Sequence, residues 1–119
     1  MTKFKSMKKF MLLIREDLRL LKEMTPEQSE ADIRTMVQWV EEITQAGNFV
    51  QGDPLENDIN MVTRDGIHSD GPFIETKEAI SGYTIIKAES LIQAGEIAAT
   101  CPLVHKGQIK IEVRPILEF

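Results

Sequence analysis

The densest group of ionisable side chains in the sequence lies in one short stretch, Asp70-Gly71-Pro72-Phe73-Ile74-Glu75-Thr76-Lys77. Two carboxylates, an ammonium group and a hydroxyl surround a Gly-Pro turn there. Because Gly and Pro constrain the backbone, the turn can fix the direction of the Asp70 side chain and aim it into a cleft. We expect Asp70 to be the catalytic, proton-handling group. The alternative is that Asp70 caps the turn by accepting hydrogen bonds from backbone amides.

Side chains near Asp70 are expected to bind the ligand. Glu75, Thr76 and Lys77 can position a small anion or donate to a substrate oxygen, and a Lys77 ammonium beside a carboxylate would keep it ionised. The alternative for Glu75 and Lys77 is a solvated ion pair, worth at most about 1 kcal/mol. The predicted ligand-binding set combines the turn residues with two side chains farther along the chain: Gly71, Pro72, Phe73, Glu75, Thr76, Lys77, Tyr83 and Arg114.

His68 is the second catalytic candidate. Residues two apart on a strand share a face, so His68 and Asp70 would point the same way. An unperturbed His titrates near neutral pH and suits a general base. The alternative is a surface His on a hairpin.

Tyr83 and Arg114 each leave two interpretations open. Tyr83 follows Gly82 at the start of a predicted strand, where its hydroxyl can face the cleft or the ring can pack in the core with a solvated tip. Arg114 can bind a ligand carboxylate or form a salt bridge across a dimer interface.

Other reactive residue types do not form a recognisable site. Cys101 continues an apolar helical stripe and is expected to be a buried, inert thiol. His105 is expected in an exposed loop, and the two His residues have no metal-ligand spacing with Cys101. The sequence contains no phosphate-binding Gly-rich loop and no nucleophile elbow. We therefore predict no metal and no cofactor.

Length and charge restrict the class of protein. The 119 residues suit one domain, predicted over residues 8–119 after a disordered lead-in at 1–7. A net charge of −5 argues against nucleic acid as a partner. The apolar run from Phe10 to Ile14 is too short for a signal peptide or a membrane span. With one Cys in the chain, these features predict a cytoplasmic protein that binds no membrane.

The first half of the chain predicts a strand and a long helix. Five apolar residues lie between the charges at Lys9 and Arg15, a length typical of a central strand covered on both faces. Residues 16–24 fit either a helical turn or an irregular connection. Thr25, Pro26 and Gln28 form a capping box with Pro at the first position, predicting a helix over 26–46. Its expected core stripe is Ile33, Met36, Val37, Val40 and Ile43, with Trp39 at the edge.

The second half predicts strands around another helix. Residues 48–52 read as a strand, and Asp65-Gly66 predicts a two-residue hairpin in which Thr63 faces His68. Residues 82–88 form a further strand, followed by a helix that Ser90 caps and Pro102 ends. Its expected stripe is Leu91, Ala94, Ile97, Ala98 and Cys101. In the last strand, 108–116, apolar and charged residues alternate between the two faces.

This order predicts an α+β fold with both helices on one face of the sheet, a ferredoxin-like βαββαβ sandwich with an added hairpin. The other face would be half apolar. Such a face is seldom left exposed, so we expect a homodimer.

Five ordered blocks resemble the DGPF-motif branch of the YCII-related family over residues 9–117. They are the first strand from Phe10 to Ile14, the 70–78 stretch, Gly82-Tyr83, Ala99-Thr100-Cys101-Pro102 and Ile111-Glu112-Val113-Arg114-Pro115. The resemblance implies a ferredoxin-like fold that pairs into a dimeric α+β barrel with a cleft near the 70–77 loop. It implies no particular reaction. Some members of this branch are associated with extracytoplasmic-function sigma factors.

A related branch that includes enzymes uses a His–Asp pair with the His on the first helix. Residues 26–46 of this chain contain no His. The first functional hypothesis, motivated by the ionisable cluster beside the Gly-Pro turn, is a protein that binds a small organic molecule and performs cofactor-free acid–base chemistry, of isomerase or lyase type, through Asp70. The second, which the absence of a His on the first helix supports, is a non-catalytic binding or regulatory module, with an extracytoplasmic-function sigma factor as a candidate partner. The third is a purely structural subunit with a filled, dry barrel.

Overall fold

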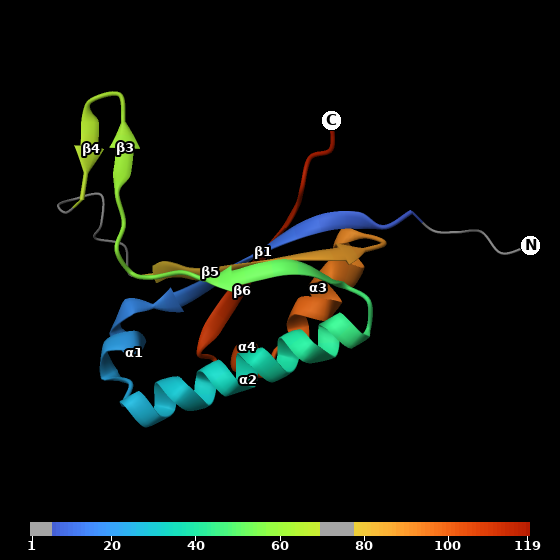
Figure 1. Ribbon diagram of the computed structural model, residues 1–119, viewed down its shortest axis with the longest axis horizontal. Coiled ribbons are helices and arrows are strands. Elements are labelled where there is room, and N and C mark those ends of the chain that lie inside the picture. Colours follow the sequence, from blue (N-terminus) through green and yellow to red (C-terminus); the bar gives the residue numbers. More distant parts are fainter. Residues whose placement is uncertain (1–5, 70–77) are drawn as a thin grey trace, which may run out of the picture.

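A four-stranded antiparallel sheet carries all the helices on one face in the computed structural model, which describes residues 6–69 and 78–119 (Figure 1). The strand order is β2-β5-β1-β6. Its strands are β1 (Lys8–Asp17), β2 (Phe49–Pro54), β5 (Glu78–Ala88) and β6 (Ile109–Pro115). The helices are α1 (Leu18–Glu23), α2 (Pro26–Gln45), α3 (Leu91–Ala99) and α4 (Pro102–His105). This is the predicted ferredoxin-like arrangement.

Strand β1 lies in the middle of the sheet, and its apolar residues alternate between the two faces. It pairs with β5 on one side and β6 on the other. Phe10, Leu12 and Ile14 are buried against the helices. Met11 and Leu13 point to the opposite face and are half-buried in the single chain. The central position is thus confirmed, whereas the second face has no covering layer among the described residues.

A bulge interrupts the pairing between β1 and β5. Ile14 lies opposite Gly82 and Arg15 opposite Ile80, so Ser81 is an extra residue on β5. The strand begins at Glu78, four residues before the predicted start. The prediction placed the start at Gly82 because a glycine commonly marks a strand boundary, but here it lies inside the paired strand beside the bulge.

Helix α2 has the predicted capping box and length, but its core face is rotated from the predicted one. Trp39 is 1% exposed and Ile43 is buried, whereas Ile33 and Val37 are 62% and 53% exposed. The predicted stripe was wrong at Ile33 and Val37. A Trp ring buries more apolar area than either side chain, so the packed face is the one that carries Trp39. Leu91, predicted on the α3 stripe, is likewise exposed.

The hairpin is formed by β3 (Met61–Thr63) and β4 (Gly66–His68), which project from the main sheet on the side away from the helices (Figure 1). Thr63 pairs with Gly66 and Met61 with His68, so the predicted pairing of Thr63 with His68 was wrong by two residues. The predicted turn needs positive φ at both Asp65 and Gly66. Only Gly66 has it, so the turn is made by Arg64 and Asp65 instead.

Two short helices complete the helical layer. Residues 18–23 of the ambiguous 16–24 segment form α1, which Asp17 caps by accepting a hydrogen bond from the Arg19 amide. His105 was predicted in a loop but is the last residue of α4. Pro102 explains both the end of α3 and this helix, because proline suits the first position of a new helix. No helix of the described residues is long and apolar enough to cross a membrane.

The close approach of β2 to β5 yields a stability prediction. A Cβ on Gly52 would lie 2.7 Å from the Tyr83 carbonyl oxygen, whereas one on Gly95 of α3 would meet nothing within 4 Å. Gly52→Ala should lower the free energy of unfolding by about 1–3 kcal/mol. Gly95→Ala should raise it by about 0.5–1 kcal/mol, because alanine favours a helix. Urea denaturation measures both, and equal stability of the two variants would contradict the close approach.

Candidate functional site

Most of the site predicted from sequence lies outside the described residues. Asp70, Gly71, Pro72, Phe73, Glu75, Thr76 and Lys77 all fall in the 70–77 gap, so their roles stay predictions. His68 lies on the projecting hairpin, with its Nε2 3.4 Å from the Thr63 hydroxyl.

Tyr83 and Arg114 lie on the sheet face that the helices leave uncovered. Tyr83 pairs with Leu13 and with Asp53, and its hydroxyl donates to Asp53 Oδ2 at 2.8 Å. Arg114 lies opposite Met11 and is 3.8 Å from Glu112 Oε2. His68 therefore lies on β4 of the hairpin, Tyr83 on β5 and Arg114 on β6.

An open-sided cavity of about 530 Å³ lies between α2, over residues 29–41, and the sheet. Its lining is mainly apolar, and its volume is within the range of small-molecule sites. The apolar side chains come from β1, α1 and its C-cap, α2, β2 and α4: Ile14, Leu21, Met24, Ile33, Met36, Val37, Val40, Phe49 and Leu103. Exposed Ile33 and Val37 thus belong to this cavity rather than to the core.

Two glycines contribute to the floor of the cavity. Gly52 pairs with Thr84, and Gly82 pairs with Ile14; Thr84 and Ile14 are buried on the helix-facing side. A side chain at Gly82 would begin 3.5 Å from Ile14 Cδ1 and 3.2 Å from the Asp53 carbonyl oxygen. Glycine at these two positions permits the close approach of the neighbouring strands that form the floor.

Glu16 and Ser81 form a polar pair at one end of this floor. The Ser81 hydroxyl donates to Glu16 Oε1 at 2.8 Å, and both residues line the cavity. Ser81 is the extra residue of the β5 bulge. Bulges commonly redirect a side chain near a functional site, and here the bulge brings a hydroxyl to the carboxylate.

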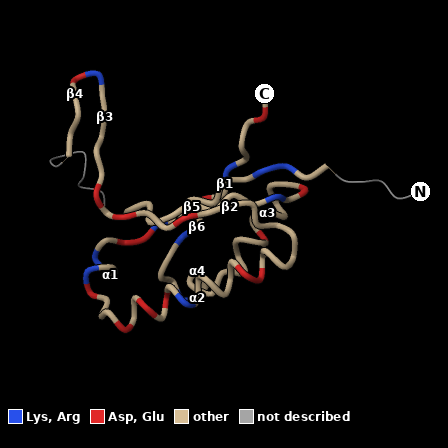
Figure 2. Tube along the Cα trace, viewed as in Figure 1, with Lys and Arg blue, Asp and Glu red and all other residues tan. Residues whose placement is uncertain are grey.

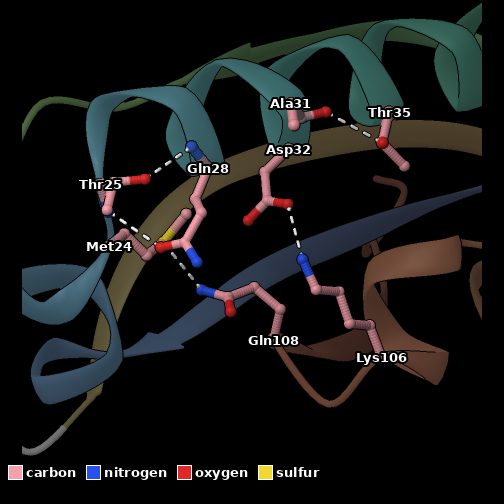
Figure 3. A network of polar contacts seen from close by, with 8 residues as sticks. All are labelled: Met24, Thr25, Gln28, Ala31, Asp32, Thr35, Lys106 and Gln108. Carbon is pink, nitrogen blue, oxygen red and sulfur yellow. Dashed lines mark hydrogen bonds and ion pairs between the residues drawn. The ribbon is translucent and has the colours of Figure 1, made fainter.

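Asp32 lines the cavity from α2 and is held by the loop that precedes β6 (Figure 3). Its Oδ1 is 3.2 Å from Lys106 Nζ, and its side chain is only 13% exposed. Its Oδ2 is buried and has no hydrogen-bond partner. Gln108 from the same loop donates to the Met24 sulfur at 3.2 Å. These contacts connect the start of α2 and the residue before it to the loop that precedes β6.

The second half of α2 is anchored differently. Trp39 Nε1 donates to the Thr100 hydroxyl at 2.8 Å, and the Cys101 thiol lies 3.5 Å from the Met36 sulfur. Both contacts fix α2 to the junction of α3 and α4. The helix is therefore packed in the core at Trp39 and Ile43 and borders open space at Ile33 and Val37.

The charged residues among the described lining of the cavity are all acidic: Glu16, Asp32, Glu41 and Asp53, of which Asp53 accepts a hydrogen bond from the Tyr83 hydroxyl on the uncovered face of the sheet. None of the described residues that line it is a Lys, Arg or His. Figure 2 shows several acidic residues along α2. Such a cavity disfavours anionic ligands, because like charges in a partly desolvated site repel strongly.

The sequence analysis did not identify Glu16, Ser81 and Asp32, although two of them left a signal. Glu16 continues the alternation of Phe10, Leu12 and Ile14, which puts a carboxylate on the apolar face of β1. Asp32 precedes Trp39 by seven residues and therefore lies on the same helical face. In both cases the signal in the sequence was a charged residue at a position whose neighbours on the same face of the strand or helix are buried. Ser81 left none, since the bulge cannot be read from residue types.

The remaining reactive groups show no second site in the described parts of the chain. Cys101 is buried, as predicted, and burial raises the pKa of its thiol above the ordinary value of 9.0. His105 is exposed, with Nε2 2.6 Å from the Ala99 carbonyl oxygen. Residues 6–69 and 78–119 contain no cluster of three or more His, Cys, Asp or Glu that could hold a metal ion.

Comparison with known proteins identifies one family. The model of the YCII-related domain matches residues 8–119, which is nearly the whole chain. A search of curated proteins found no significant match.

The buried thiol yields a prediction on reactivity and pH. Cys101 should react with a thiol reagent such as DTNB far more slowly in the folded protein than in urea, because burial disfavours the thiolate. The raised pKa also stabilises the fold below the unfolded-state value, and this contribution is lost as the pH rises above it. Between about pH 8 and pH 10, wild-type protein should therefore lose more unfolding free energy than Cys101→Ala. Fast labelling of the folded protein would contradict the burial.

Proposed function

The chain belongs to the YCII-related domain family, and we propose that it binds a small, largely apolar organic molecule in the cavity between α2 and the sheet. The observation that carries the proposal is the 530 Å³ cavity, lined by apolar side chains with a few polar groups at its ends. Ligand sites typically combine these features.

The apolar side chains around the mouth support the proposal. Ile33 and Val37 are exposed, although both lie on a helix with a well-packed core face. Exposed apolar side chains that border a cavity are typical of ligand sites rather than of solvated helix surfaces. A purely structural subunit, in contrast, would have a filled interior without a cavity.

We propose further that the protein belongs to the DGPF-motif branch of the family and that Asp70 supplies any acid–base chemistry. The support for both is the sequence of the 70–78 stretch and the blocks that accompany it. Glu16 at the cavity is a second carboxylate suited to contact a ligand. The regulatory alternative, association with a sigma factor, is supported only by the family resemblance.

A tryptophan substitution at the mouth tests the binding site. Val37→Trp should weaken the binding of a ligand or neutral apolar probe such as Nile red at least tenfold, because the indole would fill the mouth of the cavity. Gln38→Trp is the matched control, since Gln38 is exposed on the same helix and does not line the cavity. Fluorescence titration of the probe measures both. Equal affinity for the two variants would place the ligand elsewhere.

We also propose that two copies pair through the sheet face opposite the helices. The support is a cluster of half-buried apolar side chains there, Met11, Leu13 and Ile85, beside charged groups that already pair. Arg15 lies 2.9 Å from Glu112 on this face, which reduces the cost of covering the charges.

Light scattering tests the pairing. Leu13→Lys should shift the mass from two chains to one, because it places an uncompensated charge in the proposed interface. Ile92→Lys is the control, as Ile92 is exposed on α3, on the opposite side of the sheet. A monomeric wild-type protein, or a Leu13→Lys variant that keeps its dimeric mass, would refute the proposal.

A further inference from the structure

Glu16 stands apart from the other acidic groups of the cavity because it lies on the helix-facing side of the sheet and pairs with no cationic side chain among the described residues. Its Oε1 accepts from the neutral Ser81 hydroxyl, and Oε2 accepts no hydrogen bond from the described residues. Among those residues, the only buried side-chain oxygen or nitrogen without a partner is Asp32 Oδ2. Glu16 Oε2 is therefore accessible as well as unpartnered.

Each of the other three carboxylates is paired with a cation, lies on the opposite face of the sheet or is exposed to water. Asp32 pairs with Lys106, and its free oxygen is covered. Asp53 accepts from the Tyr83 hydroxyl on the opposite face of the sheet. Glu41 is exposed at the rim, where water solvates it. The charge that a ligand would meet inside the cavity is thus that of Glu16.

The backbone holds Glu16 in this position. It lies on the helix-facing side of β1, between its partners Ala79 on β5 and Ile109 on β6. The bulged Ser81 then fixes one carboxylate oxygen and leaves the other available. A carboxylate held on a strand beside apolar walls interacts with a cation more strongly than one in bulk water does.

We propose that the cavity selects small organic cations, molecules with an apolar body and a protonated amine that pairs with Glu16. The apolar walls of α2 hold the body, and the carboxylate at the end of the floor accepts hydrogen bonds from the ammonium. The inference rests on the proposed function, because it specifies the ligand class of the same cavity. Carboxylic acids and phosphates are disfavoured by the all-acidic lining.

Three probes with the same ring and different head groups test the charge preference: tryptamine, tryptophol and indole-3-propionate. Isothermal titration of the wild-type protein at neutral pH should show tryptamine binding at least tenfold more tightly than tryptophol. Indole-3-propionate should bind more weakly than either. This series needs no variant and is therefore independent of any effect on folding.

The Glu16→Gln variant tests the assigned residue. It keeps the shape of the side chain and a hydrogen-bond acceptor for Ser81 but removes the charge, so tryptamine and tryptophol should bind equally. Glu96→Gln removes the same charge from an exposed position on α3 outside the cavity and should keep the wild-type preference. Circular dichroism verifies that both variants are folded.

The outcomes separate this inference from the function on which it rests. If none of the probes binds wild-type protein and Nile red does not bind either, the cavity is not a ligand site and both proposals fail. If tryptophol or indole-3-propionate binds as tightly as tryptamine, the cavity binds ligands but the cation preference is refuted. If folded Glu16→Gln keeps the preference for tryptamine, the ammonium pairs elsewhere and the role of Glu16 is refuted.

Discussion

The anchoring of α2 by Trp39 is the constraint on which the rest of the structure depends. The indole is 1% exposed and donates to the Thr100 hydroxyl, so it fixes the second half of the helix to the α3–α4 junction. Because that face of α2 is turned to the core, Ile33 and Val37 border the cavity and are not part of the core. The cavity is a consequence of how the helix is rotated.

The start of α2 is held by polar contacts instead of by packing. The Thr25–Gln28 capping box begins the helix, and the Asp32–Lys106 pair ties it to the loop before β6. Because polar contacts hold this end of the helix, apolar side chains do not need to fill the space between it and the sheet. Gly52 and Gly82 line the cavity on the side of the sheet. The cavity is therefore apolar with acidic residues in its lining, and Glu16, beside the β5 bulge, pairs with no cationic side chain among the described residues.

The sequence predicted the fold well because the fold depends on periodic patterns. The alternation in the last strand, the capping box at Thr25 and the apolar run of β1 each specify a local structure that the tertiary contacts preserve. The rotation of α2 was predicted less well, since a stripe of aliphatic residues and a single Trp compete for one core face. The hairpin register failed for a related reason, because Asp-Gly favours a turn that Asp65 does not adopt.

The candidate site was harder to predict because it is made by tertiary structure. Glu16, Ser81 and Asp32 come from β1, β5 and α2, and no spacing along the chain brings them together. The dense group of ionisable residues at 70–77, which the sequence favours as the site, lies outside the described residues. A carboxylate at an apolar position, as at Glu16, was the subtler and more useful sign.

Intermolecular NOEs from bound tryptamine test the central claim most directly. If the cavity that α2 forms with the sheet is the binding site, the indole protons should show NOEs to methyl groups that line it, in particular those of Met36 and Val40. NOEs confined to methyl groups of Met11 and Leu13 on the opposite face of the sheet, or of Val62 on the hairpin, would contradict the account.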